Sequence, residues 1–436
     1  MHVPRLHERL RGLWNHLGLK QAHVGTQMAG DVATFAAACP GRIGTLLLCV
    51  PARLEPDPFT ALADRIVMVS GASGLTAQVT TRAAARLPGS RRVVLDGYDA
   101  PGWADIVADR TADLLRVFED FPAQPAVDLP ASTGEHAGIT YKITGNGPPL
   151  VLLPFFLAPS QWEPAIAALA RRFTVISLGG RHLGGVAALE DRAAAVSYRG
   201  MARTLWDVMG IAPGDTVLDV GCGSGALDRL LAERLGAGGR VTATDLNRFL
   251  LSEAVALAEA EGLSDRIDFR FANAEALPFA DASFDHAFSV TVLEECDADA
   301  ALRELFRVVR PGGSAGVIVR SIDLPQWWNL SLPADIAAKV NVPPQSVGAA
   351  GVADASLYPR MRRAGFSDVR CFPSLVTLDH PDGPIWRYRE DHALSLLTDP
   401  ETAIWRRRTA EARASDMLFM AHPMHCVVGW KPASTP

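Results

Sequence analysis

The sequence predicts an α/β protein of two domains, each built on a largely parallel sheet. The 436 residues exceed what a single core usually organises, so two domains are expected. In the C-terminal half, short apolar runs alternate with helical patterns, which is typical of a parallel sheet wrapped by helices. In the N-terminal half, further strand-like runs lie on both sides of a Pro-rich segment at residues 121–136.

The strands of the C-terminal half follow one another in regular order. Five are expected, at residues 216–221, 239–245, 267–274, 283–293 and 314–322. Helical patterns separate them at residues 226–235, 249–263 and 300–309, the last closed by Pro311-Gly312-Gly313. In a sheet of this kind, ligands bind at the carboxyl ends of the strands, near the point where the strand order reverses.

Two insertions interrupt the later part of this half. Residues 324–356 are rich in Pro, Gly and aromatic residues and read as a loop, whereas residues 384–415 read as a polar helical stretch. A helix at 357–366 and a strand at 368–376 lie between them, and a last strand is expected at 424–432. Because long loops inside compact domains are usually functional, both insertions are interpreted as lids over a substrate site.

Composition excludes several classes of function. Hydrophobic residues make up 48% and charged residues 21% of the chain, as in globular proteins. A net charge of -6 argues against a nucleic-acid partner, which needs a basic face. No apolar run reaches about 18 residues, so no membrane partner is expected. The N-terminus lacks the apolar core of a signal peptide. The six cysteines form no C-x-x-C pair, which predicts reduced thiols, no metal and a cytoplasmic location.

The main motif is V-L-D-V-G-C-G-S-G at residues 217–225. Its three glycines follow a strand and open a helix, where the absence of a Cβ lets the backbone approach a ligand. The spacing is not the G-x-G-x-x-G of dinucleotide-binding proteins. Asp219, two residues before the first glycine, can anchor a positively charged ligand. A tight turn without a ligand is the alternative for the glycines alone.

With these residues, the segment from about Tyr198 onward resembles a class I S-adenosylmethionine-dependent methyltransferase, most of all the small-molecule enzymes of ubiquinone and menaquinone biosynthesis. The resemblance implies a Rossmann-like, seven-stranded sheet and S-adenosylmethionine as cofactor. It assigns the ribose hydroxyls to Asp245 and the adenine to the N-A-E-A-L-P-F segment that begins at Asn273. The residues expected to bind the cofactor are Asp219, Gly221, Cys222, Gly223, Gly225, Asp245, Leu246, Asn273, Ala274, Glu275 and Val290.

Two positions depart from the family pattern. Asn273 stands where Asp is usual, and its carbonyl can still accept a hydrogen bond from the adenine amino group. Glu295 stands where His is common, which weakens the case for a fixed base. The catalytic residue therefore stays open. The first candidates are His286, Glu295, Tyr358 and His392, followed by His380, His422 and His425.

Two further motifs carry alternatives. His422-Pro-Met-His425 could be a metal pair, but an exposed turn before the last strand is favoured. Trp327-Trp328 could form an aromatic substrate wall or part of the core. The S-V-T-V-L run at residues 289–293 replaces the N-P-P-Y-like turn common in methyltransferases of nucleic-acid bases, which favours a small-molecule acceptor.

Residues 14–50 resemble the nucleophile-elbow region of an α/β-hydrolase. The turn Gly25–Gly30 has Gln27 where the nucleophile would stand, and glutamine has no oxygen that a base could activate. The strand at 65–74 lacks the triad acid, and Asp99 occupies the position of the triad histidine. Because the three groups act as a unit, hydrolase chemistry is not expected.

Residues 138–178 resemble the opening strands of the same fold, with Pro154-Phe155-Phe156 in place of the His-Gly oxyanion turn. The later part of the fold therefore comes first, which predicts a permuted α/β-hydrolase-like sheet. The two pieces pair either within one chain, which is preferred, or between subunits. The expected domains are 1–125 (hydrolase-like), 126–136 (linker), 137–190 (completing the first domain) and 191–436 (methyltransferase).

The favoured function is methyl transfer from S-adenosylmethionine to an oxygen or carbon of a small natural-product-like or quinone-like acceptor. Positioning and desolvation supply much of the catalysis in such a displacement, and a base is needed only for a protonated nucleophile. The N-terminal domain would be a scaffold, a cap or an oligomerisation surface, so a homodimer or higher homo-oligomer is possible. The alternatives are a methyltransferase fold used for cyclisation or decarboxylation, and a non-enzymatic binding protein.

Overall fold

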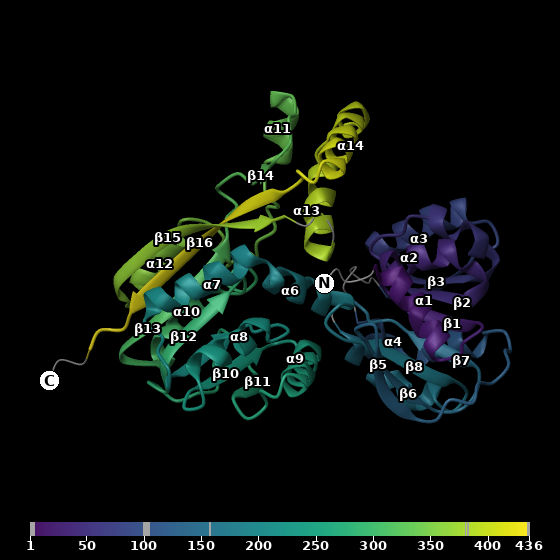
Figure 1. The fold of residues 1–436 in the computed structure, drawn as a ribbon, viewed down its shortest axis with the longest axis horizontal. Coiled ribbons are helices and arrows are strands. Elements are labelled where there is room, and N and C mark those ends of the chain that lie inside the picture. The colour runs from purple at the N-terminus through teal and green to yellow at the C-terminus, as the bar shows by residue number, and fades with distance from the viewer. Residues whose placement is uncertain (1–4, 99–104, 157, 380, 382, 434–436) are drawn as a thin grey trace. The chain divides into compact units, whose positions relative to one another are not determined.

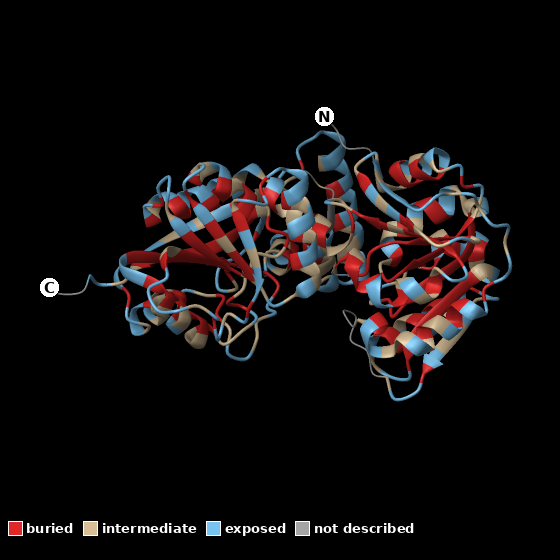
Figure 2. Cartoon of the chain, turned by 90° about the horizontal axis from the view of Figure 1, so that it is seen from below, coloured by how far each residue is buried: buried red, intermediate tan, exposed pale blue. Residues whose placement is uncertain are grey.

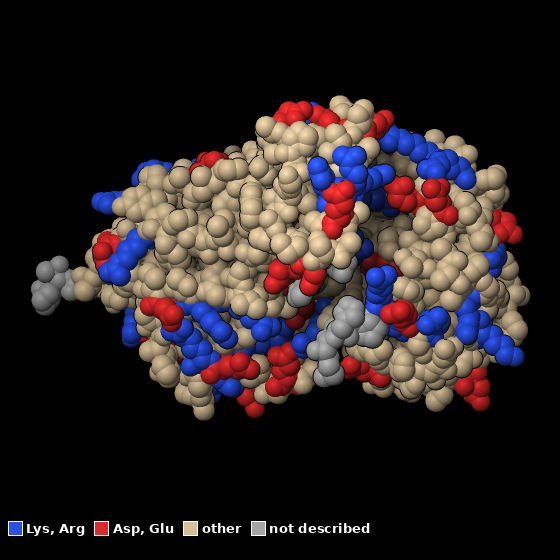
Figure 3. All heavy atoms as spheres, turned by 45° about the horizontal axis from the view of Figure 1, so that its top comes forward, with Lys and Arg blue, Asp and Glu red and all other residues tan. Residues whose placement is uncertain are grey.

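The computed structural model describes residues 5–98, 105–156, 158–379, 381 and 383–433 (Figure 1). The chain divides into two compact units, residues 1–187 and 188–436. Asp99 and His380, both considered in the sequence analysis, lie outside the described residues. Among the residues described, no helix is both long and apolar enough to cross a membrane. Positive and negative side chains are interspersed on the surface in Figure 3.

The N-terminal unit alternates strands and helices. Its α-helices are α1 (Leu6–His16), α2 (Ala29–Ala38), α3 (Gly74–Arg86), α4 (Ile106–Glu119) and α5 (Glu163–Leu169). Its strands are β1 (Ala22–Thr26), β2 (Ile43–Cys49), β3 (Ile66–Gly71), β4 (Arg91–Leu95), β5 (Ser132–His136), β6 (Ile139–Thr144), β7 (Pro149–Leu152) and β8 (Thr174–Gly179). Three 3₁₀ segments complete it, η1 (Pro40–Arg42), η2 (Asp57–Arg65) and η3 (Pro159–Trp162).

All eight strands of this unit form one sheet, in the order β4-β3-β2-β1-β7-β8-β6-β5. β1 pairs in parallel with β2 on one side and with β7 on the other, so strands from before and after the Pro-rich segment meet in the same chain. Of the two arrangements expected from the sequence, the structure has the intrachain one. The end of the predicted linker is itself a strand, β5, which pairs with β6 at the edge.

The central strands explain why the sequence reads there as continuous apolar runs. Every residue of β1, β2, β3 and β7 is buried, because helices cover both faces of a parallel sheet (Figure 2). Two apolar clusters result, one around Trp14 and Phe35 and the other around Phe118 and Trp162.

The C-terminal unit begins within α6 (Gly184–Ala194). Its helices are α7 (Val196–Met209), α8 (Ala226–Leu235), α9 (Arg248–Ala260), α10 (Ala298–Val308), α11 (Ala334–Val340), α12 (Leu357–Arg363), α13 (Gly383–Ser395) and α14 (Asp399–Ala414). Its strands are β9 (Thr216–Val220), β10 (Arg240–Asp245), β11 (Ile267–Phe271), β12 (Phe284–Val290), β13 (Val309–Arg320), β14 (Trp327–Trp328), β15 (Ser367–Leu378) and β16 (Met420–Trp430).

The second sheet runs β11-β10-β9-β12-β13-β16-β14, and β15 also pairs with β16. The pairs from β11 to β13 are parallel, whereas β16 is antiparallel to its neighbours. The order reverses between β9 and β12, so a ligand site is expected at their carboxyl ends. Seven strands were expected and the sheet contains eight, because the two residues of β14 add a short strand.

The insertions are more regular than their composition suggested. The first contains β14 and α11. The second is two helices, separated where Thr398 and Glu401 form a capping box and Pro400 follows. The last strand begins at Met420, four residues before the predicted Met424, so His422 and His425 lie inside β16 and not in an exposed turn. In Figure 1, α11, α13 and α14 gather at one end of the sheet.

Candidate active site

The glycine loop between β9 and α8 adopts a backbone that only glycine accepts easily. Gly221, Gly223 and Gly225 have φ values of +87°, +57° and +71°. A Cβ on Gly221 would overlap the Cγ2 atom of Val292. The backbone N–H groups of Gly221 and Cys222 both donate to Thr244 O, at 2.7 and 2.9 Å. The loop is therefore a rigid turn in which added side chains would clash.

Two buried carboxylic acids lie beneath this loop. Asp219 is the fourth residue of β9 and is 3% exposed, while Asp228 in the first turn of α8 is completely buried. The two side chains interact with each other, and among the described residues neither carboxylate oxygen of Asp228 has another hydrogen-bond partner. Burial raises the pKa of both acids, and each acid lies close enough to affect the other. The charge of Arg229 favours the ionised form of Asp228, but no basic side chain in the described structure forms an ion pair with either acid, so the pair suits a cationic ligand group.

Asp245 ends the neighbouring strand β10 and holds the loop in position. One of its carboxylate oxygens accepts from Gly223 N at 2.9 Å and the other from Asn247 N at 2.8 Å. Burial raises its pKa. Since a carboxylate offers about four acceptor positions, two remain for a pair of hydroxyl groups. Leu246, the next residue, is 61% exposed and offers an apolar surface beside that acceptor.

Asn273 begins the turn after β11, at the same edge of the sheet. Its side-chain carbonyl accepts from Glu275 N at 3.0 Å, and a carboxylate oxygen of Glu275 accepts from Asp297 N at 2.9 Å. The turn is thereby tied to the start of α10. Asn273 is exposed and Ala274 half-buried, so both remain accessible beside the ends of the strands.

A strained residue follows β12 at the same edge of the sheet as the glycine loop. Thr291 has a φ of +58°, which is unusual for a β-branched residue and is typical of functional sites. Its hydroxyl donates to Val290 O at 2.7 Å and accepts from the Arg192 guanidinium at 3.1 Å. Neither Thr291 nor Arg192 was predicted from the sequence, because a positive φ at threonine and a contact across 99 positions leave no local pattern.

Helix α6, which precedes the second sheet, is held against the glycine loop by a buried network of ion pairs and hydrogen bonds. Glu190 accepts from Ser224 Oγ at 2.6 Å and from the Arg229 guanidinium at 2.7 Å. Arg229 also pairs with Glu261 at 3.1 Å, and its side chain is only 6% exposed. α6 therefore covers the loop from above.

The first two catalytic candidates, His286 and Glu295, have different positions relative to the sheet. His286 is the third residue of β12 and lies toward its opposite end, where its ring contacts Ser314 Oγ at 2.8 Å and Asp215 at 3.2 Å. That position does not suit a base acting on a substrate at the carboxyl ends. The Glu295 side chain is 63% exposed and pairs with Arg320 at 3.0 Å.

The other candidates are spread over the lids. Tyr358 on α12 packs against an apolar cluster, with its hydroxyl 3.4 Å from an Arg362 nitrogen. His392 on α13 lies 3.1 Å from Val342 O. Neither contacts the glycine loop.

His422 and His425 lie on opposite faces of β16, as their odd spacing requires. His425 Nε2 is 2.7 Å from Asp323 Oδ1, whose pKa is lowered to about 2 despite partial burial, through hydrogen bonds from Ser321 and His425. His422 is buried, and its Nδ1 has no partner. The two rings therefore do not form a pair of ligands for one metal.

Trp327 and Trp328 have different environments. Trp328 is 3% exposed and packs edge-to-face on Trp386 and Trp405, with ring centroids 5.3 and 4.9 Å apart. Trp327 is 50% exposed and contacts Phe419. Trp328 is thus a core residue, and Trp327 is a surface residue. Trp328 packs β14 against both helices of the second insertion.

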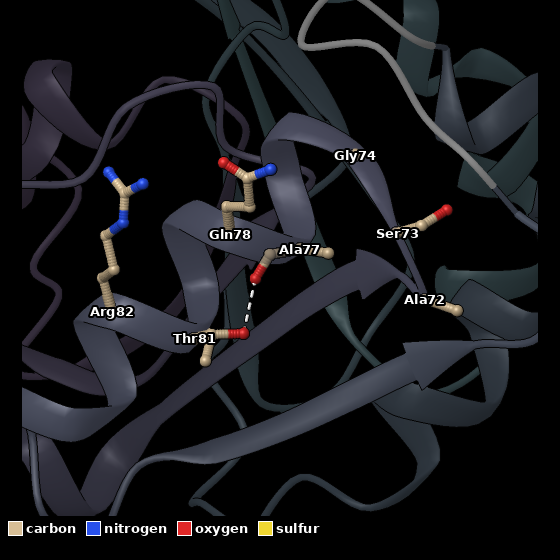
Figure 4. Close-up of a pocket in the computed structure, with 7 residues that line it drawn as sticks. All are labelled: Ala72, Ser73, Gly74, Ala77, Gln78, Thr81 and Arg82. Carbon is tan, nitrogen blue, oxygen red and sulfur yellow. Dashed lines mark hydrogen bonds between the residues drawn. The ribbon is translucent and has the colours of Figure 1, made fainter.

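The turn after β1 in the N-terminal unit is closed by its own side chains. Gln27 Oε1 accepts from Phe156 N at 2.9 Å, and Thr26 Oγ1 accepts from Met28 N at 3.0 Å. Figure 4 shows the turn after β3, where a surface hollow lies against α3. The seven described residues that line this hollow include no carboxylate.

The fold and the site together define an α/β domain whose parallel strand ends hold a glycine loop, a buried acid pair and a carboxylate with acceptor positions to spare. These features fit S-adenosylmethionine, which has an ammonium group, a ribose diol and an adenine ring. The buried acid pair is the observation that decides the fit, since a dinucleotide pyrophosphate would be repelled by carboxylates there.

Comparison with known proteins agrees. A methyltransferase-domain family matches residues 217–313. The ubiquinone/menaquinone biosynthesis C-methyltransferase UbiE of Xanthomonas oryzae pv. oryzae is 41% identical over 119 residues, 27% of this chain and 47% of that protein. Methyltransferase GfsG of Streptomyces halstedii is 38% identical over 124 residues, 28% of this chain and 44% of that protein. A solved SAM-dependent methyltransferase of Aquifex aeolicus is 21% identical, with a TM-score of 0.33, over 42% of this chain and 89% of that one.

Residues 217–313 therefore match a methyltransferase domain, and the prediction of S-adenosylmethionine as the cofactor is confirmed. The chain spans about half the length of the curated relatives that it matches. The matched segment includes the glycine loop, Asp228, Asp245 and Thr291.

Proposed function

We propose that the chain transfers the methyl group of S-adenosylmethionine to an oxygen or carbon atom of a small molecule. The observation that carries this proposal is the acid pair Asp219–Asp228 beneath the glycine loop, with Asp245 on the next strand. The relatives that match this segment are named as methyltransferases, and one of them as a C-methyltransferase of quinone biosynthesis.

In this proposal the residues of the chain bind and orient. When bound, the cofactor supplies an electrophilic methyl group on a sulfonium sulfur. Asp219 and Asp228 hold the ammonium group, Asp245 accepts hydrogen bonds from the ribose, and Leu246 and Asn273 border the adenine. Thr291, at the end of β12, lies next to the acceptor. The catalysis expected of such a site is positioning and exclusion of water.

The test is formation of S-adenosylhomocysteine, followed by mass spectrometry, with a panel of phenols, quinols and carboxylic acids. We expect turnover with at least one acceptor class, and loss of turnover in Asp228→Asn. The exposed acid Asp268 offers a control, and Asp268→Asn should retain activity. Tight cofactor binding without consumption by any acceptor would contradict methyl transfer and favour a non-methylating reaction on the same fold.

We further propose that residues 1–125 and 137–190 form a permuted α/β-hydrolase-like domain without catalytic function, joined by a linker at 126–136 and followed by the methyltransferase domain at 191–436. The strand order supports this. Numbered from β5 to β8 and then from β1 to β4, the sheet reads 1-2-4-3-5-6-7-8, with antiparallel pairing only where β6 meets β5 and β8. The turn at Gln27 then follows the fifth strand, as a nucleophile elbow does.

The elbow itself supports the loss of chemistry. An oxyanion hole needs free backbone N–H groups after the nucleophile and from the turn after the third strand. Here Thr26 Oγ1 accepts from the first, Met28 N, and Gln27 Oε1 accepts from the second, Phe156 N. We expect no p-nitrophenyl acetate hydrolysis above background by the full chain or by Gln27→Ser. Turnover by the unmodified chain would contradict this role.

A further inference from the structure

A group of basic side chains lies beside Thr291 that binding of the cofactor does not use. It consists of Arg192 on α6, Arg320 at the end of β13, Arg389 on α13 and His422 on β16, and is named here the arginine cluster. The positive charges of Arg389, Arg192 and Arg320 all act on His422. Three elements from distant parts of the unit thus bring positive charge to the imidazole on a fourth.

Arg389 is the member of the arginine cluster whose positive charge is least balanced by its surroundings. The residue is 5% exposed, and burial lowers its pKa to about 10, which leaves it charged at neutral pH. Its described contacts include one hydrogen bond, from a guanidinium nitrogen to Gln326 Oε1 at 3.2 Å, while its Nε atom has no partner. No acidic residue in the described part of the chain pairs with it. A buried arginine in this state is costly unless a ligand neutralises it.

The position of Arg389 is fixed by the second insertion. Trp386, three residues earlier on the same face of α13, is buried against Trp328. The tryptophan anchors the helix, so the guanidinium is turned inward, toward His422 on the sheet. His422 is also buried, since it is 5% exposed, and its Nδ1 has no side-chain partner among the described residues. Burial and the surrounding arginines lower its pKa, so the ring is neutral and can donate a hydrogen bond.

The remaining charges do not cancel the cluster. Arg320 pairs with Glu294 at 3.5 Å and with Glu295 at 3.0 Å. Arg192 contacts the hydroxyl of Thr291 and the ring face of Tyr198 but forms no ion pair in the described structure. Glu294 is fully buried and burial raises its pKa. The charges of Arg320 and Arg192 both act on Glu294. Among the described residues, Arg389 therefore has no acid beside it, and Arg192 has a nearby acid but no ion pair.

We propose that the acceptor carries an oxyanion, a carboxylate or a phosphate, which binds to Arg389 and Arg192 with a hydrogen bond from His422. This inference rests on the proposed function, because it names the acceptor class of the same site. Arginine suits such a group, since its planar donors match two oxygens at once. The negative end of the acceptor would lie under α13, and its nucleophilic atom would point toward Thr291 and the cofactor.

The test uses the full chain saturated with S-adenosylhomocysteine. Saturation-transfer NMR titrations with benzoate, phenyl phosphate and the neutral isostere benzamide measure acceptor-site binding. We expect one of the two anions to bind at least tenfold more tightly than benzamide, and the anion preferred identifies the oxyanion. Arg389→Met should abolish this preference, and Arg389→Lys should retain part of it. Arg203→Met, at an exposed position on α7, is the matched control.

Each outcome separates the two proposals. Equal binding of anions and benzamide, or an anion preference that survives in Arg389→Met, overturns the oxyanion assignment. Failure of S-adenosylhomocysteine to bind the unmodified chain overturns the proposed function instead. A folding defect is also distinguishable, because removal of an uncompensated buried charge should leave the thermal midpoint of Arg389→Met unchanged or raised. A large fall in that midpoint would show that Arg389 is a structural residue and would contradict the inference.

Discussion

Substituting Gly221 by alanine tests whether the loop is as tightly specified as its geometry indicates. The φ of +87° costs an L-residue about 1–2 kcal/mol, and the overlap of the new methyl with Val292 Cγ2 adds about 1–3 kcal/mol. The free energy of unfolding should therefore fall by about 2–5 kcal/mol. Urea denaturation followed by circular dichroism measures this loss.

Two further variants separate strain from overlap. Gly210 at the end of α7 has a similar φ of +81°, but a Cβ there would meet no atom within 4 Å. Gly210→Ala should therefore lose only about 1–2 kcal/mol. Adding Val292→Ala to Gly221→Ala should restore about 1–3 kcal/mol of the free energy of unfolding. Adding it to Gly210→Ala should restore none. Additive effects of Gly221→Ala and Val292→Ala, within about 0.5 kcal/mol, would refute the reasoning.

Three other outcomes are expected. Because burial raises the pKa of Asp219 and Asp228, cofactor affinity should rise from pH 6 to pH 8 by at most about tenfold per pH unit, and calorimetry should show a flatter profile for Asp228→Asn. In the free protein the sign is opposite, since ionising the buried pair lowers stability as pH rises. Arg229→Met should lower the free energy of unfolding by about 3–5 kcal/mol, because it leaves buried Glu190 without its ionic partner. Arg234→Met, which removes an exposed ion pair, should lower it by under about 1 kcal/mol. Thr291→Gly should raise the unfolding free energy by about 1 kcal/mol as backbone strain is relieved; a loss of similar size would show that no strain is stored there.

The strands of the methyltransferase domain were predictable because their patterns are local. The central strands are short apolar runs, and the glycine loop, Asp245 and Asn273 lie at the ends of β9, β10 and β11. Parallel pairing then brings their carboxyl ends to one edge. The sequence also contained the information that His286 lies far from this edge, because it is only the third residue of a parallel strand.

The residues that were missed depend on contacts between distant segments. Asp228 in the first turn of a helix reads as a favourable acid at the helix N-terminus, and only its complete burial beside Asp219 shows another role. Arg389 lies in a stretch that reads as a polar surface helix, and Trp386 turns it inward. The two tryptophans at 327–328 illustrate the same limit, since one side chain is core and the other surface.

Calorimetric titration of the full chain with S-adenosylhomocysteine tests the central claim, that the edge formed by β9, β10 and β12 is a cofactor site, most directly. We predict one site per chain, with affinity reduced about tenfold to a hundredfold in Asp245→Ala, because a charged acceptor of the ribose hydroxyls is lost. The affinity of Asp245→Asn, whose side chain can still accept a hydrogen bond from Gly223 N, should lie between those of the unmodified chain and Asp245→Ala. Absence of binding to the unmodified chain, or the same affinity in all three proteins, would contradict the account.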